Sequence, residues 1–464
     1  MPEPIVVTGG SMAALATADA LASAGQSVEL LVPAKGVGAG FAPMRKDGRA
    51  LELGVRLLEL HYEGAEAEQV PPLAEYHPEI GGHRPFTPLV HDWIAERAGD
   101  RLVEAERARM AIDGRVVDDL YFTTDPSVLH DALSDEERAV IAAEARRAAE
   151  VEGDAGLLAP ERAGELAGMA LDEASIACHG AAFHARLAEP YAAKVLAGGT
   201  SAVLATLRRK AWVPLFWPRT LAQACGDETV TFHPDRPFHT IAGGGAGQIV
   251  DILMERLRAH PNAEVRTVGA LEAIAPANGS GVRFEFSDAG TIHAKRPVIG
   301  NAPAELFGAA GVEYTPAKAR TVILWIEVDD ADLLWAPALL NVVDADCPVL
   351  RVSSGGSAAG PAQRILTVEL AHDQDPAAAE PAVRDALERF GVIREGAPFT
   401  VAMAAAAPTF ALPTAENVER FARARDELRA LGLDADIVGG AADFAADALN
   451  EQIVQALKVT EERS

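Results

Sequence analysis

The stretch PIVVTGGSMAALATADALASAGQSVELLV, from Pro4 to Val32, decides how the rest of the chain is interpreted. An apolar strand from Ile5 to Thr8 passes through a small turn into an Ala-rich helix and returns in a second strand from Ser27 to Val32. This order predicts a βαβ unit. In such a unit the helix N-terminus offers unpaired N–H groups and a positive dipole end to a pyrophosphate, provided that no side chain intervenes.

The turn matches the dinucleotide fingerprint G-x-G-x-x-G only in part. Its three slots hold Gly9, Ser11 and Ala14, and alanine in the third slot still allows close packing of helix and strand. Ser11 adds a side chain where phosphate would approach, and Val32 replaces the acidic residue that would bind the ribose hydroxyls. The turn alone leaves open a dinucleotide site and a purely structural turn. For a dinucleotide site, we expect Gly9→Val to abolish binding and to leave the fold largely intact.

The composition is that of an ordinary globular protein. A chain of 464 residues exceeds the size at which one core keeps growing, which predicts two domains. The 68 acidic and 41 basic residues give a net charge of −27, which argues against nucleic acid or an anionic membrane as the main partner. Three scattered cysteines, Cys178, Cys225 and Cys347, do not suit a disulfide framework or a metal cluster, so no metal site is expected.

The expected location is the cytoplasm. No basic stretch with an apolar region and a cleavage site opens the sequence, and no apolar run reaches the roughly 18 residues of a spanning helix. The excess of Ala and Arg over Ile and Lys suggests a GC-rich bacterial genome.

A glycine-rich loop, Gly36 to Phe41, follows the βαβ unit, and an extended segment from Lys46 to Gly54 comes next. Asp47-Gly48 is a hairpin-type turn signal within that segment. This order resembles the flavoprotein superfamily of amine oxidases, protoporphyrinogen oxidases, phytoene desaturases and UDP-galactopyranose mutases. In that family the loop commonly carries Gly-Gly followed by Arg or His near the flavin, whereas this chain has Ala39 and Gly40 there.

Two later segments extend the resemblance to nearly the whole chain. Phe238 to Ile274 resembles the family's Gly-rich turn, helix and cofactor-contacting strand, in which Leu271 holds the contacting position. Near the C-terminus a strand ends at Val438-Gly439-Gly440, where the family has Gly-Arg or a similar pair, and the last helix opens at Leu449. A helix N-terminus of that kind would stabilise negative charge on a reduced flavin. The resemblance implies cofactor contacts at Gly9, Gly10, Ser11, Ala14, Val32, Gly38, Gly40, Phe41, Leu271, Gly439, Gly440 and Asn450.

The middle of the chain is expected to form a helix-rich substrate domain, mostly helical from Pro126 to Leu207. Trp212, Trp217 and Arg219 are the candidates for lining a substrate cavity, with interdomain packing or a surface ion pair as the alternatives. His179 and His184 are weak candidates for acid–base catalysis, since histidines in such helices more often serve packing or capping.

The resemblance implies an α/β fold with a Rossmann-like FAD-binding domain interleaved with a helix-rich α+β substrate domain. The expected FAD-binding segments are residues 1–75, 236–303 and 409–464, and the expected substrate segments are residues 76–235 and 304–408. The implied function is hydride transfer from a small organic metabolite to FAD, as an oxidase or desaturase. Because Ser11, Val32, Gly40 and Gly440 all depart from the family pattern, two alternatives stay open. One is a flavin-free structural or regulatory partner of an active paralogue, as a heteromer or homodimer, and the other is a redox-neutral mutase that uses flavin.

Overall fold

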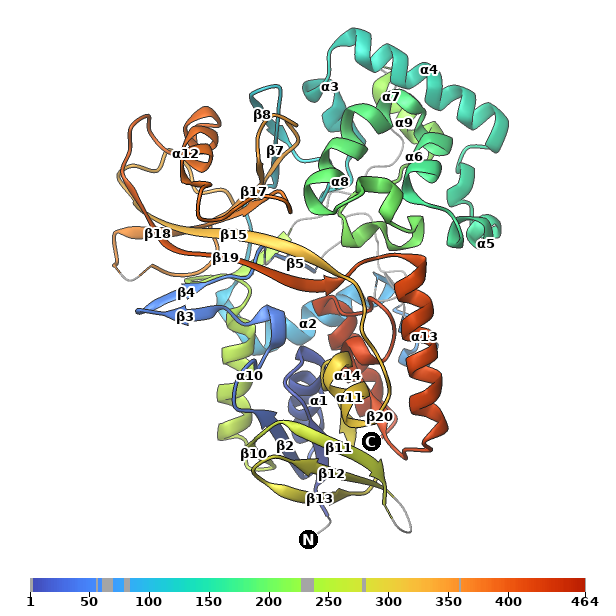
Figure 1. Cartoon of the computed structure of the whole chain (residues 1–464), viewed down its shortest axis with the longest axis vertical. Coiled ribbons are helices and arrows are strands. Elements are labelled where there is room, and N and C mark those ends of the chain that lie inside the picture. The colour runs from blue at the N-terminus through green and yellow to red at the C-terminus, as the bar shows by residue number, and fades with distance from the viewer. Residues whose placement is uncertain are drawn as a thin grey trace.

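A five-stranded parallel sheet forms the base of the molecule in the computed structural model, which describes residues 3–55, 57–60, 70–78, 84–226, 238–277, 281–358 and 360–463 (Figure 1). All four neighbouring strand pairs of this sheet are parallel. In spatial order its strands are β10 (Ala263–Val268), β2 (Val28–Pro33), β1 (Ile5–Thr8), β14 (Val298–Ile299) and β20 (Asp436–Ile437). The predicted N-terminal βαβ unit is confirmed, with α1 (Met12–Ser23) between β1 and β2.

Helix α1 is almost wholly buried because other helices cover it. Its alanines leave room for α14 (Leu449–Glu461) and α10 (Gln248–Ala259) to pack closely against it. The core of this domain joins the helices to the parallel sheet through residues such as Leu15, Leu30 and Ile453, which have no exposed surface. The chain therefore brings its first, middle and last parts together around α1.

A seven-stranded sheet forms a second layer above this domain. Its spatial order is β19 (Phe399–Ala411), β15 (Lys318–Asp329), β18 (Gln363–Leu370), β17 (Val349–Ser353), β16 (Leu340–Val342), β7 (Arg109–Ile112) and β8 (Arg115–Asp118). Helix α12 (Glu380–Arg389) covers one face. On the other face, the hairpin of β3 (Met44–Lys46) and β4 (Arg49–Leu51) inserts Leu51 against Trp325. Positive φ angles at Asp47 and Gly48 confirm the predicted hairpin turn.

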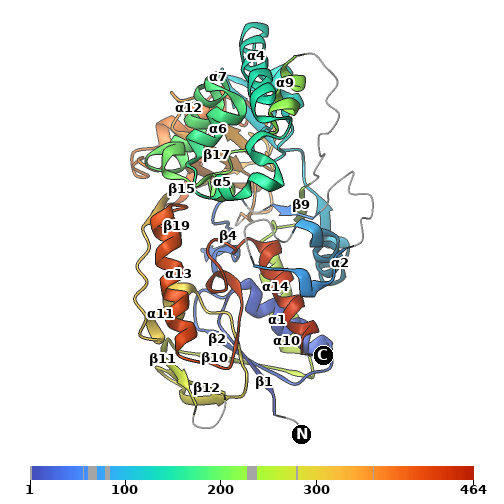
Figure 2. The ribbon, with the colours of Figure 1, turned by 90° about the vertical axis from the view of Figure 1, so that its right-hand side faces the viewer.

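The predicted helix-rich region forms a lobe beside this sheet (Figure 1), and in Figure 2 this lobe faces the viewer. Ser134 and Glu137 form a reciprocal capping box at the start of the longest helix, α4. The lobe contains α3 (Leu129–Ala132), α4 (Asp135–Glu152), α5 (Ala163–Ala167), α6 (Leu171–His179), α7 (Ala181–Phe183), α8 (Glu189–Val195) and α9 (Pro218–Cys225).

Shorter elements connect the layers. An antiparallel sheet joins β11 (Leu271–Pro276), β12 (Val282–Phe286) and β13 (Gly290–Ala294), while β9 (Phe238–Ile241) pairs with β5 (Leu58–Glu59) and β6 (Leu102–Glu104). Helices α11 (Pro303–Ala309) and α13 (Ala415–Ala430) lie beside the parallel sheet (Figure 1). Strands β13 and β14 are close in sequence but belong to different sheets.

Helix α2 (Thr87–Ala98) lies within the segment 76–235 that was expected to belong to the substrate domain. It places Val90 and Ile94 in the core around α1. The apolar face of α2 thus has its partners in the base domain, and the domain bounds stay a prediction. No described helix combines the length and apolar character needed to cross a membrane.

Candidate functional site

The turn between β1 and α1 is tightly enclosed by the protein itself. Gly9 has a φ of +107°, and a Cβ atom there would lie 2.4 Å from the carbonyl carbon of Gly300. At Gly300 a Cβ atom would in turn lie 2.7 Å from the Cβ atom of Ala14. The glycine at position 9 is therefore required by its conformation and by the neighbouring strand end. The expectation that Gly9→Val leaves the fold intact is wrong for this reason.

Two of the N–H groups at the start of α1 have partners within the chain. The Ser11 side chain caps the helix and accepts a hydrogen bond from the Ala14 amide at 3.2 Å. The Ala13 amide donates to Oε1 of Gln452 at 3.0 Å. This bond brings a side chain of α14 onto the N-terminus of α1, across 439 residues of sequence. These two donors are of the kind that a helix N-terminus can otherwise offer to an anion.

Two glutamines of α14 fix this arrangement. Gln452 also donates through Nε2 to the carbonyl oxygen of Asp447 at 2.7 Å. One turn later, Oε1 of Gln455 accepts from the Gly439 amide at 2.6 Å, and its Nε2 donates to the carbonyl oxygen of Ala446 at 3.1 Å. The two side chains are 5% and 4% exposed. The oxygen and the nitrogen of each side-chain amide therefore both have a partner inside the protein.

The glycine-rich loop closes directly on the same turn. The Gly38 amide donates to the carbonyl oxygen of Gly10 at 2.6 Å. A Cβ atom at Gly38 would lie 2.6 Å from a methyl group of Val250, so the loop is also held against α10. Val32, at the end of β2, is 2% exposed and belongs to the apolar core. No carboxylate stands at this position to bind a ribose.

The remaining candidate cofactor residues have structural surroundings. Leu271 begins β11 and is buried in a core with Phe284. Asn450 donates to the carbonyl oxygen of Glu59 at 2.5 Å, which ties the start of α14 to β5. Phe41 is half-buried and packs against the base-domain core, whereas Gly40 is exposed beside it and Gly440 is half-buried after β20. The structure brings together Gly9, Ser11, Ala14 and Gly439, but Leu271 and Asn450 lie in other contacts.

These observations test whether the residues present fit FAD. A bound pyrophosphate needs free N–H groups and close approach to the turn. Here Gln452 and Ser11 engage the Ala13 and Ala14 N–H groups, and Gly9, Gly10 and Met12 are buried. With Gln452 and Ser11 in these positions, two donors at the helix start are not available to an FAD pyrophosphate.

His179 is a structural residue of the helical lobe. Its side chain has no exposed surface, and its Nε2 accepts from the Phe216 amide at 2.8 Å. Burial lowers the pKa of His179 to about 3, so the ring is neutral near pH 7. A group in this state does not exchange protons with a substrate at neutral pH. His184 lies one short helix further on and is half-buried, with no carboxylate paired to it among the described residues.

The three candidate substrate residues do not converge. Trp212 stacks on Phe122 with ring centroids 3.8 Å apart, inside the seam between lobe and sheet. Trp217 is 53% exposed just before α9. Arg219 lies in the first turn of α9 and forms an exposed ion pair with Asp154 at 3.4 Å. Of the three, Trp212 alone lies between the lobe and the sheet, where it packs against Phe122.

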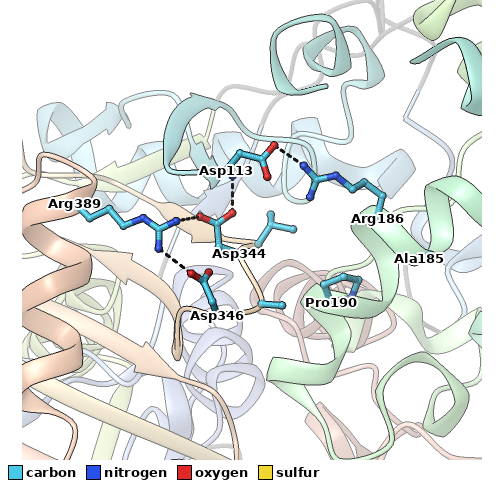
Figure 3. Close-up of a pocket in the computed structure, with 9 residues that line it drawn as sticks. Asp113, Ala185, Arg186, Pro190, Asp344, Asp346 and Arg389 are labelled. Carbon is cyan, nitrogen blue, oxygen red and sulfur yellow. Dashed lines mark hydrogen bonds and ion pairs between the residues drawn. The ribbon is translucent and has the colours of Figure 1, made fainter. Parts of the chain in front are cut away.

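A cavity of about 400 Å³ opens between the helical lobe and the seven-stranded sheet (Figure 3). Its charged groups are paired with one another: Arg186 contacts Asp113 at 2.6 Å, and Arg389 contacts Asp344 at 2.9 Å. The Asp344 carboxylate also accepts from the Asp113 amide at 2.6 Å. These bonds hold the β7–β8 turn against the sheet. Among the described residues no cluster of His, Cys, Asp and Glu is arranged to hold a metal ion.

Two residues that contact the α1 turn and the nearby Gly439, Gln452 and Gln455, were not predicted from the sequence. Gln452 and Gln455 are three residues apart on the buried face of α14, flanked by Ile453, Val454 and Ala456. Two amides on an otherwise apolar helix face are a signal that they satisfy buried backbone groups. Their partners, Ala13 and Gly439, could not be identified without the tertiary structure.

The overall structure is similar to several solved structures over the whole chain. A reduced UDP-galactopyranose mutase matches with a TM-score of 0.68 and 12% identity, covering 100% of this chain and 94% of the other. Cyclohexylamine oxidase from Brevibacterium oxydans IH-35A matches with a TM-score of 0.58 and 14% identity, covering 99% of both chains. An oxidoreductase from Methanosarcina mazei matches with a TM-score of 0.57 and 12% identity, covering 99% of this chain and 100% of the other.

The chain therefore shares its overall fold with a UDP-galactopyranose mutase and with an amine oxidase, the kinds of protein that the sequence resembles. No protein-family model and no curated protein matches its sequence. The structural similarity establishes the fold, and the function has to be inferred from the residues of the site.

Proposed function

We propose that this chain is a flavin-free protein that keeps a flavoprotein fold and acts as a structural or regulatory partner of an active flavoenzyme. One observation carries the proposal: the Gln452 side chain accepts the Ala13 N–H group of α1, where the fold would otherwise present its donors to a pyrophosphate. The buried Val32 at the end of β2 supports it, because no acidic group is available there for a ribose.

The competing function is flavin-dependent hydride transfer on a small metabolite, or redox-neutral mutase chemistry with the same cofactor. The likeness of fold to an amine oxidase and a mutase supports this alternative. Binding would require Gln452 to leave two hydrogen bonds and expose the α1 turn. Displacing fully paired buried amides costs free energy that a correctly preformed site does not require.

The visible absorption spectrum distinguishes the two functions. We expect purified protein to be colourless and to remain so after incubation with excess FAD and removal of free cofactor. Flavin bands that are released on denaturation would overturn the proposal. In that case, anaerobic reduction of the bound flavin by a substrate would identify an oxidase, and turnover without net reduction would identify a mutase.

The partner role needs its own measurement. The chain is mixed with a flavin-containing relative from the same organism, and the elution volume and kcat of that enzyme are followed. A co-eluting complex with changed kcat supports a regulatory partner, and one with unchanged kcat supports a structural partner. Unchanged elution at concentrations of tens of micromolar contradicts both.

A further inference from the structure

The two outer strands of the seven-stranded sheet differ in length and in charge. One edge is β8, which has four residues and carries Arg115 and Asp118 at its ends. The other edge is β19, which has thirteen residues and no charged side chain. Natural proteins keep edge strands short or place charges on them, because the outward N–H and C=O groups of an edge can pair with another strand. Strand β8 is protected in this way and β19 is not.

Strand β19 is paired on one side only. It runs antiparallel to β15, and no other segment in the described part of the chain forms hydrogen bonds with its backbone. None of its residues is buried although most of them are apolar, and Ala404, Ala406 and Ala407 are exposed. Met403 and Ala405 pack against the core that contains Trp325, so the edge is held in its extended form. A strand fixed in this way loses little conformational freedom when a partner binds.

Two features limit the part of β19 that can accept another strand. Val401 and Met403 pair with consecutive residues of β15, which leaves Ala402 as an extra residue in a bulge. Pro408 lacks the N–H group that a ladder requires. Between the bulge and the proline, residues 403–407 keep a regular register against β15. These five residues, MAAAA, are therefore the regular part of the unpaired edge.

We propose that residues 403–407 pair antiparallel with the same residues of a second copy of this chain, so that two sheets join across a two-fold axis. A symmetric pairing that uses the whole segment is centred on Ala405, and it places Ala404 of one copy opposite Ala406 of the other. This pairing lies outside the α1 turn and does not involve Gln452. It goes beyond the proposed flavin-free function and does not depend on it.

Charge favours a second copy as the occupant of this edge. The chain carries a net charge of −27, so contact between two copies generally brings carboxylates together. Like charges directly opposite one another destabilise a strand pair. Self-pairing of residues 403–407 sets only alanine and methionine side chains opposite one another, so this edge avoids that repulsion.

Sedimentation equilibrium of the whole chain, from micromolar to hundreds of micromolar concentration, tests the pairing. We expect the wild type to reach twice the monomer mass. Ala404→Lys with Ala406→Lys sets a lysine opposite a lysine on both sides of the axis and should weaken dimerisation at least about 10-fold. Ala404→Lys with Ala406→Glu sets a lysine opposite a glutamate at the same places and should preserve the dimer. The two lysines also lower the net charge of each copy, so a general electrostatic effect would act in the opposite direction.

Ala139→Lys with Ala430→Lys is the matched control, because both alanines are exposed on helices outside the sheet. It should dimerise like the wild type, and every variant should keep the far-UV circular dichroism of the wild type. A wild type that stays monomeric, or that assembles beyond a dimer, overturns the proposal. Equal dimerisation by the wild type and the double-lysine variant also overturns it, as does a lysine–glutamate variant that dimerises no better than the double-lysine variant.

Ala405→Cys gives a second measurement that introduces no charge. Symmetric pairing brings the two new side chains to a Cβ–Cβ distance of about 4.5–5.5 Å, near the range that a disulfide bridges. Mild oxidation should therefore produce a covalent dimer, whereas Cys178, Cys225 and Cys347 are buried and should leave the wild type unlinked. Absence of the covalent dimer contradicts the pairing. A monomeric wild type that binds a flavin-containing relative through β19 would assign the edge to that protein and overturn self-pairing. The FAD spectrum is independent of all these outcomes.

Discussion

Replacing Gln452 by alanine removes the contact that closes the α1 turn. The change deletes the hydrogen bond from the Ala13 amide at 3.0 Å and the bond to the carbonyl oxygen of Asp447 at 2.7 Å. The side chain is 5% exposed, so water does not readily replace it. Leaving a buried N–H group unpaired costs about 1–3 kcal/mol, and the second bond contributes about 1 kcal/mol. We therefore expect the free energy of unfolding to fall by about 2–4 kcal/mol.

Urea unfolding followed by circular dichroism measures this loss in the absence of any nucleotide. Gln374→Ala is the matched control, because that amide bonds only to its exposed neighbour Asp373, and its removal should cost less than about 0.5 kcal/mol. A loss in Gln452→Ala as small as in the control would refute the reasoning. So would a wild type that gains stability with added FAD, since a ligand that binds only the folded state must stabilise it.

Two further changes test the structural roles of residues that the sequence singled out. His179→Gln should reduce the loss of stability that the protein shows on acidification. The pKa of His179 is about 3 in the folded protein and about 6.5 in the unfolded chain, so the wild type loses up to about 1.4 kcal/mol of unfolding free energy per pH unit below about pH 6.5. The Tm of both proteins between pH 7.5 and 5 measures this difference. An equally steep Tm profile in the variant would contradict this assignment. Gly9→Val should lower the free energy of unfolding by about 2–6 kcal/mol, because the side chain would strain the backbone at a positive φ and collide with Gly300. Gly25→Ala, also at a positive φ but with open space around it, should lower the free energy of unfolding by about 1–2 kcal/mol. Similar losses for both variants in urea unfolding would show that the collision is unimportant.

The sequence predicted the elements whose signals are local. The change from apolar strand to Ala-rich helix located β1 and α1. The Asp47-Gly48 pair predicted a hairpin because its backbone angles suit these residues. These features depend on neighbours within a few positions, so a linear pattern is sufficient to find them.

Other assignments failed because several partners compete for the same kind of segment. Residues 291–299 look continuous and extended, yet β13 pairs with β12 and β14 pairs with β1. Trp217 and Arg219 were expected to line a cavity, but they lie exposed at the N-terminal end of α9. An aromatic residue followed by an arginine has the same pattern in a binding site and at a helix N-terminus, and only burial distinguishes them.

By itself, the sequence predicted a flavoprotein-like order of strands, turns and helices, in which Ser11, Val32, Gly40 and Gly440 differ from the pattern of the family it resembles. The tertiary structure decided which contacts these segments make. Gln452 meets Ala13, and Gln455 meets Gly439, because α14 packs against α1. A hydrogen bond across 439 residues has no local sequence signal, since its geometry exists only after both helices have docked. The fold could therefore be predicted from the sequence pattern. Which side chains occupy the α1 turn could not, because it depends on the contacts that α14 and α1 make in the core.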